Sequence, residues 1–108
     1  LYHLPDPMRA LAHARTITKE EMLLCTLIRY HEGAWMYVYE PFECNSVDAS
    51  VYMGPSIEAL ERMLRLTGWT YEKVGFSHDR IVYRCKPIPD FVDAETLEVR
   101  RVSKSHGE

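Results

Sequence analysis

Apolar residues in the segment 17–33, ITKEEMLLCTLIRYHEG, follow the spacing of one face of a helix. They recur at intervals of three and four positions, as Leu23, Leu24, Leu27 and Ile28. Thr18 and Glu21 have the separation of a capping box, and Gly33 stands where a left-handed C-cap is expected. The pattern predicts a helix over residues 19–32, with His31 in its last turn.

The same segment admits a second interpretation. β-Branched and aromatic residues flank Glu32-Gly33, a pair that also suits the turn of a β-hairpin. We favour the helix, because its capping residues and its periodicity agree.

Residues 56–67 show the clearest helical pattern of the chain. Ser56 is a good N-cap, and Gly68 ends the segment. One continuous apolar arc is formed by Ile57, Ala59, Leu60, Met63, Leu64 and Leu66. Two i,i+4 ion pairs in the favourable order are predicted on the polar side, Glu58 with Arg62 and Glu61 with Arg65.

Other segments have the composition of strands. Residues 34–40 alternate, with Met36 and Val38 on an aliphatic face. Residues 49–53 are a second short candidate, and residues 69–76 and 80–86 predict two strands joined in a hairpin. Near the C-terminus, Leu97 and Val99 predict a weak strand, or else a short helix capped by Asp93.

These elements predict an α+β two-layer sandwich. An antiparallel sheet of about four strands would carry both helices, 19–32 and 56–67, on one face, because the two apolar stripes need the same core. A single domain over 17–102 is expected, preceded by an N-terminal arm over 1–16 and followed by a flexible tail over 103–108.

A winged-helix arrangement is the alternative architecture. It requires residues 46–54 to form a short helix capped by Ser46, with Gly54-Pro55 in the turn before the DNA-reading helix. Glu58 and Glu61 argue against it, because the phosphates of a nucleic acid repel carboxylates on such a helix.

Composition narrows the class of protein. The chain has 108 residues, of which 46% are hydrophobic and 27% charged, as in an ordinary globular domain. Its net charge of −3 argues against strong non-specific binding to phosphates. Cys25, Cys44 and Cys85 form no CxxC pair, and we interpret them as free thiols of a cytoplasmic protein. No apolar run is long enough to span a bilayer, so no membrane association is expected.

Motifs for catalysis or for metal binding are weak. Ser77-His78-Asp79 has the residue types of a catalytic triad, but adjacent residues cannot aim three side chains at one another, so a turn is predicted. The histidines and cysteines lack CxxC, HxxxH and HExxH spacings. Neighbouring carboxylates disfavour the thiolate of Cys44. We therefore predict a non-catalytic protein without metal or cofactor.

Aromatic residues are the strongest functional signal. In an antiparallel sheet, five rings would form one surface for a partner: Trp35, Tyr37, Tyr39, Trp69 and Tyr71. Tyr and Trp are frequent anchors of protein interfaces. We therefore predict a small protein-protein interaction module, such as a regulator, inhibitor or assembly subunit, that binds another protein or a second copy of itself. The competing interpretation is that some of these rings belong to the core.

Binding of nucleic acid is the alternative function. It would use the same rings for base stacking, or a winged-helix surface, together with basic side chains: Arg62, Arg65, Lys73, Arg84 and Lys86. With 16 acidic against 13 basic residues, the chain favours the protein partner.

Overall fold

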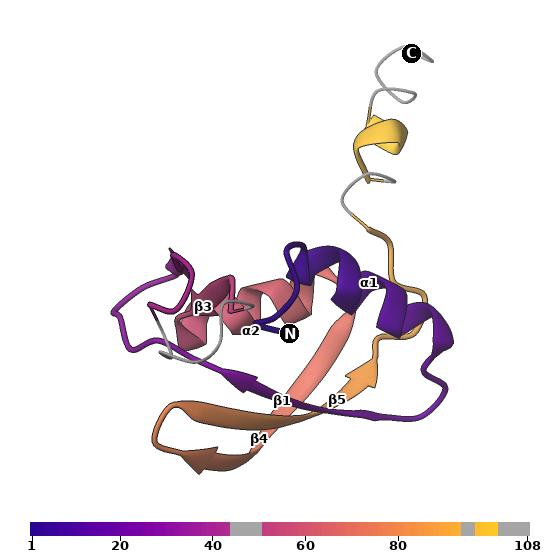
Figure 1. Ribbon diagram of the computed structural model, residues 1–108. Helices are drawn as coiled ribbons and strands as arrows, with labels where there is room; N and C mark the ends of the chain where they lie inside the picture. Colours follow the sequence, from indigo (N-terminus) through magenta and orange to yellow (C-terminus); the bar gives the residue numbers. More distant parts are fainter. Residues whose placement is uncertain (44–50, 94–96, 102–108) are drawn as a thin grey trace.

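A computed structural model of the chain describes residues 1–43, 51–93 and 97–101. In chain order these residues form α1 (Pro7–Ile17), β1 (Met22–Leu27), β2 (Met36–Val38), β3 (Met53–Pro55), α2 (Ile57–Leu66), β4 (Trp69–Ser77) and β5 (Arg80–Pro87). Figure 1 shows α1 and α2 lying over the same face of the sheet made by β1, β5 and β4. The predicted class, an α+β fold in two layers with an antiparallel sheet, is confirmed.

The strands of the described residues belong to two sheets rather than to one. The larger sheet has the order β1-β5-β4, and the smaller pairs β2 with β3, all antiparallel. The hairpin predicted across residues 77–79 is confirmed: Ser77 pairs with Arg80, and His78 takes the positive φ of 41° that the tight turn requires.

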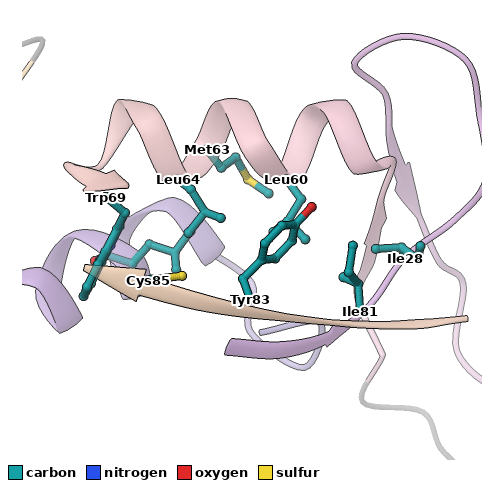
Figure 2. Close-up of a cluster of buried hydrophobic side chains, with 9 residues drawn as sticks. Ile28, Leu60, Met63, Leu64, Trp69, Ile81, Tyr83 and Cys85 are labelled. Carbon is teal, nitrogen blue, oxygen red and sulfur yellow. The ribbon is translucent and has the colours of Figure 1, made fainter. Parts of the chain in front are cut away.

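The core lies between α2 and the central strand β5. Alternate residues of β5, namely Ile81, Tyr83 and Cys85, are completely buried, and Leu60 and Leu64 of α2 pack on them. Figure 2 shows this row of side chains between helix and sheet, with Trp69 at one end and Ile28 at the other. The buried face of β5, made of every second residue, therefore packs against the apolar face of α2, as the sequence predicts.

The helix predicted over residues 19–32 is wrong. Residues 22–27 are the strand β1, in six-residue register with β5, and Gly33 lies in a loop with φ of 85° rather than at a helix end. Thr18 is the C-cap of α1, not the start of a new helix. The alternative hairpin at Glu32-Gly33 is wrong as well, because β1 pairs with β5 and β2 pairs with β3.

Residues 22–27 form a strand because they pair with β5, the central strand of the larger sheet. Short apolar runs suit either structure, so periodicity alone cannot decide between them. The buried strand β5 has backbone N–H and C=O groups on both edges, and those facing away from β4 need a partner. Residues 22–27 supply it, and their side chains then alternate: Leu23 is 64% exposed while Thr26 is fully buried.

The predicted N-terminal arm, residues 1–16, contains all but the last residue of the eleven-residue helix α1. Asp6 caps it by accepting a hydrogen bond from Arg9 N–H at 3.0 Å, and Pro7 occupies the first helical position, where its missing N–H has no consequence. Leu11 is buried in the core, and its carbonyl accepts a bond from Trp69 Nε1 at 3.1 Å. The segment is therefore part of the packed fold.

Arg15 fastens the other end of α1 to the sheet. Its Nε donates to the Gly68 carbonyl at 3.0 Å, and its Nη2 donates to the Ile88 carbonyl. The guanidinium also lies 5.5 Å from the centroid of the Phe91 ring. One side chain thereby joins α1 to the start of β4 and to the chain that follows β5.

Further predictions differ in detail from the structure. The second helix runs over 57–66 with Ser56 as its N-cap, as expected. The strand predicted over 34–40 is shorter, and Val38 is 69% exposed rather than turned to the core. Of the two alternatives near the C-terminus, residues 97–101 adopt the helical one, with Leu97 N–H bonded to the Asp93 carbonyl.

The winged-helix alternative is wrong for the part of the chain that the structure describes, because its first helix is replaced by β1 and its Gly54-Pro55 turn lies in β3. The helix capped by Ser46 that it required and the strand predicted over 49–53 begin outside the described residues, and the tail predicted over 103–108 lies outside them entirely.

Candidate functional site

Three of the five predicted partner-binding residues lie together, at the end of the molecule where α2 begins. Trp35 is 59% exposed, Tyr37 is 36% exposed, and the rings of Tyr37 and Tyr39 lie 4.8 Å apart. All three belong to β2 or to the residues beside it, next to β3 at the left of Figure 1. This group of rings with Arg29 is called the aromatic site below.

Trp69 does not belong to that surface. Its side chain is fully buried against α1, at the opposite end of the core from Ile28 in Figure 2. The ten residues of α2 separate it from the aromatic site, a distance of about 15 Å along the helix axis. For Trp69 the competing interpretation, that the ring is core, is therefore the correct one.

Tyr71 also lies away from the aromatic site. It packs edge-on against Tyr83, with 5.5 Å between ring centroids. Its hydroxyl donates to Glu61 at 3.3 Å and accepts from Arg65. Glu61 also accepts a hydrogen bond from the Tyr83 hydroxyl at 2.6 Å. The pKa of Tyr83 is raised, mainly because the phenol is buried and secondly because of this bond. Tyr71 therefore joins α2 to the sheet and is partly buried.

Ser56 positions the aromatic site. Its hydroxyl accepts from the N–H groups of Trp35 at 2.9 Å and of Ala59 at 3.2 Å, and it donates to the Gly33 carbonyl at 2.7 Å. Its own N–H donates to the Trp35 carbonyl at 2.8 Å. The N-cap of α2 thus also holds the chain on both sides of Trp35.

Arg29 lies over the tyrosines of the aromatic site. Its guanidinium carbon is 3.7 Å from the centroid of Tyr37 and 5.6 Å from that of Tyr39, within cation–π range of both. Hydrogen bonding to Tyr39 raises the pKa of Arg29 further above its usual value. On the other side, Tyr37 donates its hydroxyl to Glu43, and this bond is the main cause that raises the pKa of Tyr37.

A pocket of about 90 Å³ opens beside these rings. Most of its lining is aromatic or apolar, and it is formed by Arg29, Tyr30, His31, Trp35, Met36, Tyr37, Gly54 and Ser56. His31 stacks on Trp35 with 4.5 Å between ring centroids, instead of ending a helix as expected. Met36 forms the inner wall, where it packs against the core.

Gly54 brings β3 close to the aromatic site. A Cβ at this position would lie 2.8 Å from Tyr39 Oη and 2.9 Å from Tyr39 Cε2, closer than packed atoms approach. Residue 54 therefore has to be glycine if the Tyr39 ring is to keep its place beside Tyr37. The winged-helix alternative places this glycine in a turn, whereas the structure uses it for close packing.

The basic residues of the nucleic-acid alternative do not form one surface. Arg62 on α2 pairs with Glu58 at 3.3 Å, and Arg65 bonds to Tyr71. Lys73 lies on the helix side of the sheet, opposite Tyr83. The remaining two basic residues, Arg84 and Lys86, lie on the other face of the sheet, because they alternate with buried residues of β5.

Arg84, one of these basic residues, has a carboxylate on either side. Arg84 lies between Glu21 at 3.6 Å and Glu72 at 3.8 Å, and all three side chains are partly exposed. A phosphate approaching Arg84 would meet both carboxylates at close range. The two carboxylates beside Arg84 therefore disfavour the nucleic-acid alternative.

The residues considered for a catalytic triad lie at the β4–β5 hairpin. Ser77 ends β4, His78 and Asp79 form the turn, and the His78 backbone carbonyl accepts a hydrogen bond from Tyr30 Oη at 2.6 Å. Within residues 1–43, 51–93 and 97–101 no three His, Cys, Asp or Glu side chains are grouped as a metal site requires. Cys44 lies outside the described residues.

Comparisons of the chain with models of protein families, with curated proteins and with solved structures found no match. In the part of the chain that the structure describes, no helix combines the length and the apolar character needed to cross a bilayer.

Sequence reasoning missed Arg29 and Tyr30. Their signal was present in the run RYHEGAWMYVY, residues 29–39, where Arg29 precedes four aromatic residues. The prediction of a helix over 19–32 hid it, because that helix separates Arg29 from the strand that follows. A loop at 28–35 brings Arg29 back over Tyr37.

Proposed function

We propose that this chain is a small, non-catalytic protein-interaction module whose partner binds at the aromatic site. The observation that supports this most directly is the pocket of about 90 Å³ between Trp35, Tyr37 and Arg29. Trp, Tyr and Arg are the residue types that dominate binding energy at protein interfaces, above all where they border a pocket that one partner side chain can fill.

The site has features that favour binding over a purely structural role. Trp35 and Tyr30 are about 60% exposed, although each ring contacts another: Trp35 lies against His31, and Tyr30 meets Phe76 edge to face. Rings held in this way lose little conformational entropy when a partner covers them. The partner is another protein or a second copy of this chain.

A cytoplasmic site of action belongs to the same proposal. Cys25 is exposed, Cys85 is buried, and both are free thiols, as proteins of reducing compartments usually have.

Peptide selection tests the proposal. A random peptide library displayed on phage is selected on the immobilised chain, and recovered peptides are measured by titration on three proteins. We expect binding to the wild type, at least about tenfold weaker binding to the Tyr37→Ser/Tyr39→Ser variant, and unchanged binding to Leu23→Ser. Leu23 is the matched control because it is 64% exposed on the opposite face of the sheet.

Light scattering behind size exclusion runs alongside the selection. A dimer that the Tyr37→Ser/Tyr39→Ser variant disrupts would identify the partner as a second copy. The melting temperature of the variant should stay within a few degrees of the wild type, because Tyr37 is exposed at the surface. Peptides that bind the variant as well as the wild type would overturn the proposal, and so would a collapse of its stability.

A further inference from the structure

The size of the pocket limits what can enter it. A volume of about 90 Å³ suits one amino-acid side chain, whereas sites for cofactors and drug-sized ligands are typically roughly 300–1,000 Å³. The inner wall is the thioether side chain of Met36, and the outer walls are Trp35 and Tyr37. These surfaces are apolar, so the side chain that enters must be apolar too.

Arg29 lines this pocket and is exposed to solvent. Its backbone N–H is bonded to the Pro55 carbonyl at 2.8 Å, and its guanidinium carbon lies 3.7 Å from the centroid of the Tyr37 ring. A guanidinium has five N–H donors, so the hydrogen bond to Tyr39 leaves others for a carboxylate of the partner. Among the described residues, the carboxylates that form ion pairs do so with other arginines, and Glu43 is bonded to the Tyr37 hydroxyl.

We propose that the partner segment is a peptide with an apolar side chain that fills the pocket and a carboxylate beside it that pairs with Arg29. This inference rests on the proposed function, because it names the chemistry of the partner at the same site. The planar fork of a guanidinium is suited to a bidentate bond with a carboxylate, and Arg29 itself forms part of the pocket lining.

A single carboxylate fits the surroundings better than a chain of phosphates. Arg29 and His31 are the basic residues of the pocket lining, and Glu32, Glu43 and Glu58 lie close to it in sequence or space. One negative charge can approach Arg29 between these carboxylates. A polyphosphate backbone would bring several charges against them, and each would lower the affinity.

The test uses the phage-displayed library again, selected separately on the wild type and on Arg29→Gln. We expect Asp or Glu to be enriched next to a Leu, Met or Phe position on the wild type, and this enrichment to disappear on Arg29→Gln. In synthetic copies of the recovered peptides, replacing that acidic residue by its amide should weaken binding to the wild type about tenfold or more and to Arg29→Gln less than about twofold.

Two further variants separate charge from geometry. Arg29→Lys keeps the charge but lacks the planar fork, so the acidic residue should contribute only part of its effect there. Arg84→Gln is the matched control, because Arg84 lies on the other face of the sheet and already pairs with Glu21 and Glu72. It should leave both the enrichment and the affinities unchanged.

The outcomes distinguish this inference from the proposed function. Peptides that need Tyr37 and Tyr39 but carry no acidic residue, or whose acidic residue is equally important on Arg29→Gln, overturn the inference alone. Peptides that bind independently of Tyr37 and Tyr39, or failure to recover any peptide, overturn both. Tighter binding of a mixed single-stranded oligonucleotide, dependent on Arg29 and falling steeply with salt, would assign the site to nucleic acid instead.

Discussion

Ser56 and Trp35 are joined by two hydrogen bonds, one from each backbone N–H. Trp35 N–H donates to Ser56 Oγ at 2.9 Å, and Ser56 N–H donates to the Trp35 carbonyl at 2.8 Å. The same hydroxyl caps α2 through Ala59 N–H. Ser56 therefore both caps α2 and holds Trp35 in place. The stability of the helix and the geometry of the aromatic site depend on this one side chain.

Ser56→Ala should lower the free energy of unfolding by about 2 kcal/mol, because it removes the cap of α2 and leaves the Trp35 N–H without its acceptor. Urea unfolding measures this loss. Ser77→Ala, at the exposed end of β4, is the control and should change stability by less than about 0.5 kcal/mol. Equal effects of the two substitutions would contradict the assigned role of Ser56.

The two tryptophans should respond differently to the same substitution. Trp69→Phe removes the hydrogen bond from Trp69 Nε1 to the Leu11 carbonyl and leaves a cavity in the core, so it should cost about 1–3 kcal/mol of stability. Trp35→Phe, at a ring that is 59% exposed, should cost less than about 0.5 kcal/mol. Iodide quenching of fluorescence checks the same difference: the emission lost in Trp35→Phe should be the quenchable part. A large loss of stability in Trp35→Phe would place that ring in the core.

Arg15→Ala should detach the end of α1 from the sheet. It removes two hydrogen bonds from a charged donor, to the carbonyls of Gly68 and Ile88, and should lower the free energy of unfolding by about 2 kcal/mol. Hydrogen exchange should show faster exchange along α1 than in the wild type. Arg9→Ala, at an exposed position of the same helix, should have little effect on either measurement. If Arg15→Ala and Arg9→Ala behave alike, the hydrogen bonds of Arg15 to Gly68 and Ile88 do not contribute to stability.

Gly54→Ala should disturb the aromatic site through Tyr39, because the new methyl would lie 2.8 Å from Tyr39 Oη. We expect a loss of peptide binding of about tenfold, with a smaller effect on melting temperature. A double-mutant cycle tests the cause: in a Tyr39→Ala background, Gly54→Ala should cost much less. Additive losses would mean that the methyl clashes with something else.

Stability should decrease in alkaline solution. Burial raises the pKa of the Cys85 thiol from 9.0 to about 11, so the folded state keeps this proton to a higher pH than the unfolded state does. The stabilisation is complete below about pH 9 and is lost as the pH rises toward 11, because the folded state binds more protons over that range. The raised pKa of Tyr83, caused first by burial, acts in the same direction.

Urea unfolding between pH 8 and 11 measures this decrease. Cys85→Ala should make the dependence of the unfolding free energy on pH shallower, since one of the groups responsible is gone. Cys25→Ala is the matched control, because that thiol is exposed. Identical slopes for Cys85→Ala and the wild type would show that this thiol does not contribute.

Local signals were enough for the elements around the core. Ser56 and Gly68 delimit α2, its apolar arc faces the sheet, and the alternation of Ile81, Tyr83 and Cys85 predicts a strand that is buried on one face. In these segments the capping residues, the period and the tertiary contacts all favour the same structure, so no other part of the chain was needed to predict it.

The sequence by itself determined the α+β class, the second helix, the β4–β5 hairpin and three rings of the site, because each follows from residues close together in the chain. Only the tertiary structure decided that residues 22–27 are a strand, that residues 7–17 are a packed helix and that Trp69 is core. Those outcomes depend on partners distant in sequence: β5 for the strand, and Leu11 with Gly68 for α1 and Trp69. Arg29 joined the aromatic site for the same physical reason, since its place over Tyr37 exists only once β1 has paired with β5 and the following loop has bonded to β3.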